Sequence, residues 1–239
     1  FPPALLKRAA RLGERVVASG LSKYNLQGTQ WQRPDGAGEV VLVVGQVPAD
    51  ASVRLGAPGI RSDRELLCAA RARHPAAHIV YRPHPDVVAG LRGGPALPRQ
   101  DSAPFDEIAT EASITSLLDG VDAVHVLSSL AGFEALLRGR RVHCHGMPFY
   151  AGWGLTEDAA PHPRRTRVAT LEELVAAALI LYPSYVNREG THYISAERAL
   201  EELLDWRQRP GSALQSLRRL LLRPVLGLAA ALRDRSLPK

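Results

Sequence analysis

The chain has 239 residues, 46% of them hydrophobic and 23% charged, which is the composition of a globular protein able to bury a core. Its formal net charge is +6, but only 5% of residues are aromatic and no recognition motif is present, so we expect no nucleic acid as a partner. The basic N-terminus lacks the order of a signal peptide, and no apolar run approaches the roughly 20 residues that span a bilayer. The chain has two cysteines, and they lack the spacing of a metal site. We therefore expect a cytoplasmic protein with reduced cysteines.

The expected elements alternate between helices and short apolar strands. Four runs of four or five mostly apolar residues have the length of buried strands, and they occupy residues 40–44, 78–81, 123–127 and 141–144. Helical periodicity or capping residues predict helices at residues 5–18, 62–73, 113–120, 131–138 and 170–181, two of them opened by the capping boxes Ser62–Glu65 and Thr170–Glu173. A polar connection over residues 25–39 separates the first helix from the first strand.

Strands that alternate with helices predict an α/β fold, in which a Rossmann-like parallel sheet carries helices on both faces. In such sheets ligands bind beyond the carboxyl ends of the strands. A polar cluster follows each expected strand, and the four clusters are GQVPADAS (45–52), RPHPD (82–86), SS (128–129) and HGMPFYAGWG (145–154). The sequence therefore predicts one ligand site at the carboxyl edge of the sheet.

The cluster RPHPD presents a histidine in a restrained backbone. Pro83 and Pro85 flank His84 and keep it out of a helix, beside Arg82. Such a histidine suits a phosphate oxygen or a leaving group that needs a proton. The alternative is a solvated loop histidine that pairs with Asp86, and the two prolines favour the functional interpretation.

The cluster GQVPADAS offers Gln46, Asp50 and Ser52. A carboxylate at the edge of the sheet can act as a nucleophile or a base, but an isolated aspartate more often shapes a turn. The serine pair leaves a similar choice. One of Ser128 and Ser129 stands where a helix N-cap belongs, and either the other is incidental or both serve a phosphate held at the helix N-terminus.

The cluster HGMPFYAGWG mixes glycines with Phe149, Tyr150 and Trp153. These aromatic rings either stack on a sugar or base, or pack the loop on itself. His143 and His145 alternate in a strand and point to one face, but no third ligand stands at suitable spacing, so we expect no metal. The chain also lacks a P-loop, a Gly-x-Gly-x-x-Gly motif, a Gly-x-Ser-x-Gly elbow and an Asp-x-Asp pair. A sugar-nucleotide enzyme of this kind would stabilise its leaving phosphate with hydroxyl, histidine and arginine groups.

Five segments resemble one known family: LSKYN (21–25), GQVPADAS, IVYRPHPD (79–86), HVLSSLAGFEALLRG (125–139) and GMPFYAGWGLT (146–156). They are similar to the capsule polysaccharide biosynthesis proteins of the KpsC type, which are retaining β-Kdo transferases, and the similarity covers residues 5–204. The resemblance implies one half of a GT-B fold, CMP-β-Kdo as the donor, no cofactor or metal, and a covalent double displacement onto a lipid-linked Kdo acceptor.

The resemblance also implies roles for individual residues. Asp50 would be the nucleophile, within the pattern of Gln46, Asp50 and Ser52, and His84 would contact the phosphate of CMP. Ser128 and Ser129 would hold that phosphate, and Glu134 would face the ribose. Arg82 stands where many relatives carry lysine. The remaining candidates for holding the sugar are Lys23 and Arg138, for its carboxylate, and Trp153.

We expect a CMP-sugar-binding domain over residues 1–205, with helix 5–18 as a linker, and a basic helical tail over residues 206–239. The leucine-rich, arginine-rich part of that tail, residues 217–239, suits either an anionic membrane or packing on its own domain. The expected partners are the donor, the lipid-linked acceptor, the inner face of the inner membrane and capsule assembly proteins. The acceptor-side domain of the family, which would carry the acid/base glutamate, has no counterpart in this sequence. The alternatives are a non-catalytic nucleotide-binding fragment and another metal-free GT-B enzyme, such as a sialyltransferase or a UDP-sugar 2-epimerase.

Overall fold

A computed structural model describes residues 1–23, 28–90, 104–160 and 163–208 of the chain. At its centre lies a six-stranded sheet in the order β3-β2-β1-β4-β5-β6, in which all neighbouring strands are parallel. The strands are β1 (Val40–Val44), β2 (His78–Arg82), β3 (Glu107–Ile108), β4 (Ala123–Val126), β5 (Arg141–Cys144) and β6 (Glu157–Asp158). This is the order of doubly wound nucleotide-binding folds, so the expected α/β class is confirmed.

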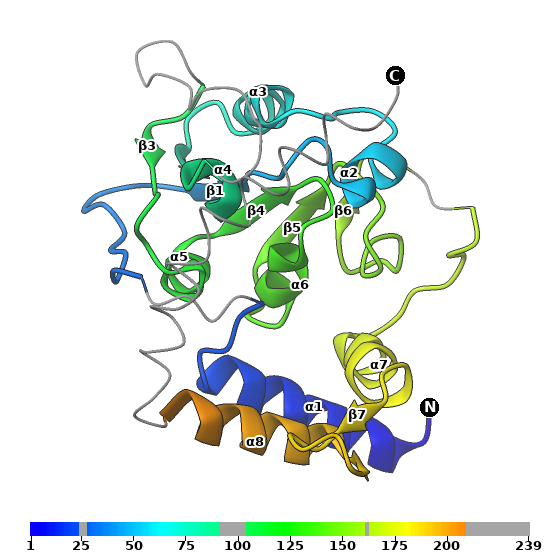
Figure 1. Cartoon of the computed structure of the whole chain (residues 1–239). Helices are drawn as coiled ribbons and strands as arrows, with labels where there is room; N and C mark the ends of the chain where they lie inside the picture. The colour runs from blue at the N-terminus through cyan, green and yellow to red at the C-terminus, as the bar shows by residue number, and fades with distance from the viewer. Residues whose placement is uncertain (24–27, 91–103, 161–162, 209–239) are drawn as a thin grey trace, which may run out of the picture.

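Helices cover both faces of the sheet (Figure 1), and alternate residues of β1 belong to two opposite cores. On β1, Val40, Leu42 and Val44 belong to a core that includes the helices α5 (Ile114–Gly120) and α6 (Leu130–Leu136). Val41 and Val43 belong to the opposite core, with α2 (Ala51–Gly56) and α3 (Asp63–Arg73). Because β1 is buried along its whole length, it reads in the sequence as a continuous apolar run.

The helix starts that were predicted from the caps Ser62, Thr170 and Ser113 are confirmed, whereas the first helix begins at Pro3, two residues earlier than expected. Ser62 and Glu65 form a capping box, as do Thr170 and Glu173, and the Ser113 side chain accepts a hydrogen bond from the N–H of Ser116. The helix that Thr170 opens begins as α7 (Leu171–Val175) and continues as a π-helix over Ala176–Leu181. Sequence patterns did not reveal the short elements α2, α4 (Pro85–Val88), β3 and β6, or the antiparallel pair β7 (Tyr185–Val186) and β8 (Tyr193–Ile194).

The N-terminal helix α1 (Pro3–Ala18) and the helix α8 (Ala196–Gln208) lie side by side (Figure 1). Leu12 and Leu200 belong to the small apolar cluster between them, and the Arg8 guanidinium donates two hydrogen bonds, of 2.6 and 2.8 Å, to the Glu197 carboxylate. The expected boundary between residues 205 and 206 falls inside α8, and residues 209–239 of the expected tail lie outside the described part of the chain. Within the described part, every helix is too short or too polar to cross a membrane.

Candidate functional site

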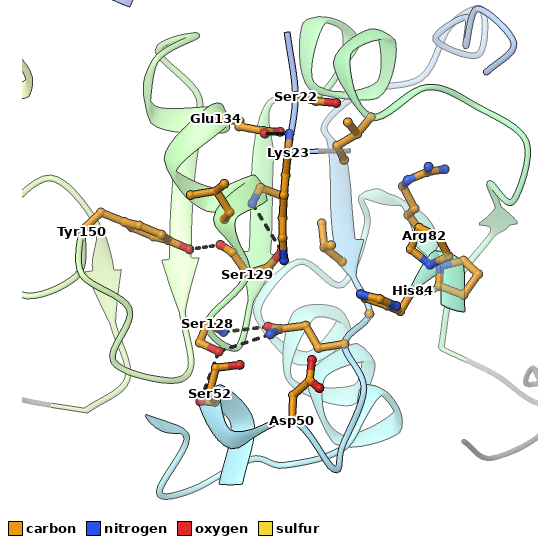
Figure 2. A pocket seen from close by; sticks show the side chains of 18 of the residues that line it. Ser22, Lys23, Asp50, Ser52, Arg82, His84, Ser128, Ser129, Glu134 and Tyr150 are labelled. Atoms are coloured by element: carbon orange, nitrogen blue, oxygen red, sulfur yellow. Dashed lines mark hydrogen bonds between the residues drawn. The ribbon is translucent and has the colours of Figure 1, made fainter. Parts of the chain in front are cut away.

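A cavity of about 390 Å³ opens at the carboxyl edge of the sheet, beside β1, β2 and β4. The strands are parallel, so the loops that follow them meet at this edge. Figure 2 shows the side chains that line the cavity. Of the eleven residues that the sequence predicted to bind substrate or act in catalysis, nine line it: Lys23, Gln46, Asp50, Ser52, Arg82, His84, Ser128, Ser129 and Glu134.

Gln46 joins the loop after β1 to the loop after β4. Its side-chain oxygen accepts a 2.7 Å hydrogen bond from the N–H of Ser128, and its side-chain nitrogen donates to the Ser128 hydroxyl at 3.2 Å. The Ser128 hydroxyl in turn donates to the main-chain carbonyl of Ser52 at 3.3 Å. These three contacts fix the floor of the cavity, because each loop is held by the other (Figure 2).

The two serines have different structural roles. Ser129 is the N-cap of α6, and its hydroxyl accepts a 3.3 Å hydrogen bond from the N–H of Ala131. The main-chain carbonyl of Ser129 accepts a hydrogen bond from the hydroxyl of Tyr150, whose side chain is completely buried. Burial raises the pKa of Tyr150 well above its usual value, so the hydroxyl remains protonated as a donor. Ser129 thus caps the helix, while Ser128 is bound to Gln46.

Asp50 occupies the N-cap position of α2, but its side chain makes no capping hydrogen bond. It lines the cavity instead, and Figure 2 draws its carboxylate on the cavity side of the loop. The turn-forming role is therefore carried by the main chain here, since the N–H of Asp50 donates to the carbonyl of Val47 at 3.0 Å. A carboxylate in this position can approach a ligand bound at the edge of the sheet.

His84 is held as the N-cap of α4. Its Nδ1 accepts a 3.2 Å hydrogen bond from the N–H of Asp86, so the neutral ring carries its proton on Nε2. The carboxylate of Asp86 lies 4.0 Å from the same Nδ1, at the outer limit of an ion pair. The ring is mostly buried and lines the cavity, where an Nε2–H group can donate to an anion.

Two cationic side chains line the cavity together with one buried carboxyl group. Arg82 is the last residue of β2, and its guanidinium donates to the carbonyl of Ala109 at 3.1 Å. Burial lowers its pKa. The side chain of Lys23 extends into the cavity, and its main-chain N–H donates to the Glu134 carboxylate at 2.9 Å. Glu134 is only 7% exposed, and burial raises its pKa.

Trp153 and Arg138 lie outside the cavity. The indole N–H of Trp153 donates to the carbonyl of Phe149 at 2.9 Å, and the Arg165 guanidinium lies 5.6 Å from the ring centre. Trp153 borders a separate, mostly apolar cavity, so of its segment only Phe149 and Tyr150 reach the candidate site. Arg138 pairs with Asp119 at 2.9 Å.

Sequence reasoning missed a carboxylate that supports the site from behind. Asp63 accepts hydrogen bonds from the N–H of Gln46 at 3.0 Å and from the hydroxyl of Tyr81 at 2.7 Å. Burial raises its pKa, and those two hydrogen bonds act in the opposite direction. In the sequence Asp63 resembles any acidic residue in the first turn of a helix, and its contact with Gln46 depends on how α3 packs against β1.

The chain is similar to several known proteins. The family described as "Capsule polysaccharide biosynthesis protein" matches residues 3–186. The capsule polysaccharide modification protein LipA of Neisseria meningitidis serogroup B is 44% identical over 196 residues, which are 82% of this chain and 28% of LipA. The lipopolysaccharide-processing protein LpsZ of Rhizobium meliloti is 44% identical over 183 residues, covering 76% of this chain and 42% of LpsZ. This chain therefore spans less than half the length of these two relatives.

Two solved structures are also similar. Thermosulfurimonas dismutans KpsC, described as a beta Kdo 2,7 transferase, has a TM-score of 0.72 and 41% identity, covering 87% of this chain and 63% of that one. A second Thermosulfurimonas dismutans KpsC structure, described as a beta Kdo 2,4 transferase, has a TM-score of 0.75 and 35% identity, covering 85% and 64%. The fold described above is thus that of a KpsC-like GT-B half.

Proposed function

The chain belongs to the capsule polysaccharide biosynthesis protein family, and from this premise we propose that it is the donor-binding half of a retaining β-Kdo transferase. The likeness to two KpsC structures described as Kdo transferases supports this proposal. Its donor is CMP-β-Kdo, and its acceptor is a lipid-linked Kdo chain of the capsule linker.

One observation carries the proposal: a carboxylate, a restrained histidine and a serine pair line a single cavity at the carboxyl edge of the sheet. The phosphate of CMP lies against Ser128 and Ser129 and accepts a hydrogen bond from Nε2–H of His84. The cations of Arg82 and Lys23 hold the anionic donor, whose Kdo residue carries a carboxylate beside the anomeric carbon. Glu134 faces the ribose.

Retention of configuration requires two displacements at the anomeric carbon. In the first, the Asp50 carboxylate attacks that carbon, the bond between the carbon and the phosphate oxygen breaks, and CMP leaves with the bonding electron pair. In the second, an acceptor hydroxyl displaces Asp50 and loses its proton to a base outside this chain. The residues around the phosphate accelerate the first step because they stabilise the charge that develops on the leaving group. Neither step uses a metal or a cofactor.

The proposed enzyme acts at the inner face of the inner membrane, together with capsule assembly proteins. Its acceptor is a lipid, and residues 217–239 combine leucine with arginine, which suits an anionic bilayer surface. The chain is then a peripheral part of that assembly.

The exchange of Asp50 for asparagine tests the proposal. An amide cannot form the glycosyl ester, so Asp50→Asn should lower turnover by about 10³-fold or more, whereas a turn-forming aspartate tolerates this change. The assay uses the full-length enzyme with CMP-Kdo, and the exposed Asp35→Asn serves as the matched control. Intact-protein mass spectrometry of the wild type should show a Kdo adduct on the peptide that contains Asp50. Near wild-type turnover in Asp50→Asn, or an adduct on another carboxylate, would contradict the proposal.

A further inference from the structure

Three buried histidines meet on the α3 side of the sheet, and none of them lines the donor cavity. His125 of β4 and His143 of β5 are directly paired in the sheet, and their rings stack with centres 4.3 Å apart. His74 is the C-cap of α3, and its ring meets the other two edge-on, with centres at 5.2 and 5.3 Å. One ring nitrogen from each histidine lies within 4.8 Å of the other two.

The Nε2 atoms of all three rings are buried, and no group in the described part of the chain forms a hydrogen bond with any of them. Buried polar side-chain atoms are nearly always hydrogen-bonded, so one such nitrogen is unusual and three neighbouring ones require an explanation. Burial also lowers the pKa of His125 to about 2 and that of His143 to about 4, which favours the neutral form of these two rings. A neutral imidazole is the form that binds a metal ion.

The opposite nitrogen of each ring is held by a partner. Nδ1 of His74 is 2.9 Å from the Glu39 carboxylate, and Nδ1 of His143 is 3.4 Å from the Glu157 carboxylate. Nδ1 of His125 is 3.0 Å from Nε2 of His145. Histidines that bind metals show this arrangement, because a carboxylate or another acceptor fixes the proton on one nitrogen and leaves the lone pair of the other for the metal.

We propose that His74, His125 and His143 bind one zinc ion through their Nε2 atoms. Imidazole nitrogens suit zinc among the common divalent ions, and three histidines are a known ligand set for it. The ion would join the C-terminal end of α3 to β4 and β5, so its role is to stabilise the sheet rather than to take part in sugar transfer. In the sequence, no third ligand stands near His143 and His145. The fold brings His74 and His125 next to His143, although both lie far from it along the chain.

Zinc content of the purified chain is the direct measurement. The chain, prepared without a metal-affinity tag, is equilibrated with zinc and freed of loosely bound ions, and its metal is counted by mass spectrometry. We expect one zinc ion per chain in the wild type and in His192→Gln, which alters an exposed histidine outside the cluster. The double variant His74→Gln/His143→Gln should retain almost none. A wild type that retains no zinc overturns the proposal and leaves water as the partner of the three nitrogens.

A second measurement covers the case in which the double variant does not fold. Cobalt bound to the wild type should give the visible absorption of a nitrogen-rich site, and zinc should displace it. In a competition with a coloured chelator, Glu157→Gln should bind zinc about 10–100-fold more weakly than the wild type, as expected when the partner of a ligating histidine is lost. The absence of a cobalt spectrum, or a folded double variant with full zinc content, would refute the site.

Discussion

Ser129 and His84 are the residues at which the proposed binding of the donor phosphate can be tested. They come from different loops and supply different groups to the cavity. Ser129 follows β4 and offers a hydroxyl group. His84 follows β2, and because its Nδ1 accepts a hydrogen bond from the N–H of Asp86, its proton is on Nε2. Each would make a hydrogen bond to a charged ligand, and such bonds contribute more than those between neutral groups.

We predict that Ser129→Ala/His84→Ala weakens CMP binding by about 2–4 kcal/mol. Titration calorimetry of CMP, UDP and GDP measures this loss and also separates a CMP-sugar enzyme from its alternatives, since we expect CMP to bind most tightly to the wild type. The exposed pair Ser184→Ala/His192→Ala is the control. Because Ser129 also caps α6, melting curves must show that the double variant is folded. Equal affinity for CMP in the variant and the wild type would place the phosphate elsewhere.

Most residues of the candidate site were predictable because their positions follow from one rule, that parallel strands end at a common edge. Lys23 and Glu134 do not follow a strand and were named only with the family resemblance. Asp63 escaped prediction because its contact with Gln46 crosses from a helix to a loop. Trp153 is the opposite case: aromatic character suggested stacking on a ligand, but its indole N–H is bound to the carbonyl of Phe149 and it borders another cavity.

At the scale of helices, two glycines in helix interiors have opposite surroundings. A Cβ atom at Gly132 of α6 would lie 2.3 Å from the Tyr150 hydroxyl and 2.9 Å or less from two atoms of its ring. Tyr150 is completely buried and cannot move aside. A Cβ atom at Gly13 of α1 would meet Leu137 and Val175 at 3.6 and 3.9 Å, which are ordinary contacts.

We therefore expect Gly132→Ala to destabilise the fold by about 3 kcal/mol through overpacking. By contrast, Gly13→Ala should stabilise it by about 0.5–1 kcal/mol, because alanine favours a helix and fills space without a clash. Urea denaturation of both variants measures the free energies of unfolding. A Gly132→Ala variant as stable as the wild type would show that the packing of Tyr150 against α6 is not as described, and a destabilising Gly13→Ala would contradict the open space beside α1.

Most of the long elements could be predicted and the short ones could not; α8 is the exception, because it is long but was not among the expected helices. The strand β1 and the helix α3 have apolar patterns or caps that leave little choice. The edge strands β3 and β6 have two residues each, which is too short for any periodicity. The π-helix at Ala176–Leu181 has the same apolar residues as an α-helix, so its wider turn has no signature in the sequence.

The charge of the whole molecule leads to a prediction about membranes. The net charge is +6, and arginines stand among leucines in residues 217–239. Each basic residue near an anionic leaflet contributes about 1 kcal/mol to attachment. Deletion of residues 217–239 should therefore lower the fraction of protein that floats with phosphatidylglycerol vesicles, and high salt should have the same effect on the wild type. Neutral vesicles provide the baseline. Equal flotation of the wild type and the deletion variant would show that residues 217–239 do not attach the protein to the membrane and would favour their packing on the domain.

The order of strands in the sheet also determines when the molecule can fold during its synthesis. The central strand β1 pairs with β4, and Val41 lies opposite Ala123. In the sequence, β2 and β3 stand between these two strands. Such distant pairing makes folding slow, because the chain must close a long loop before the contact forms. The hydrogen bond from the N–H of Ser128 to the side-chain oxygen of Gln46 joins the loops that follow these two strands. During synthesis at the ribosome, the cavity at the carboxyl edge of the sheet therefore cannot close until β4 has emerged, long after the residues of β1.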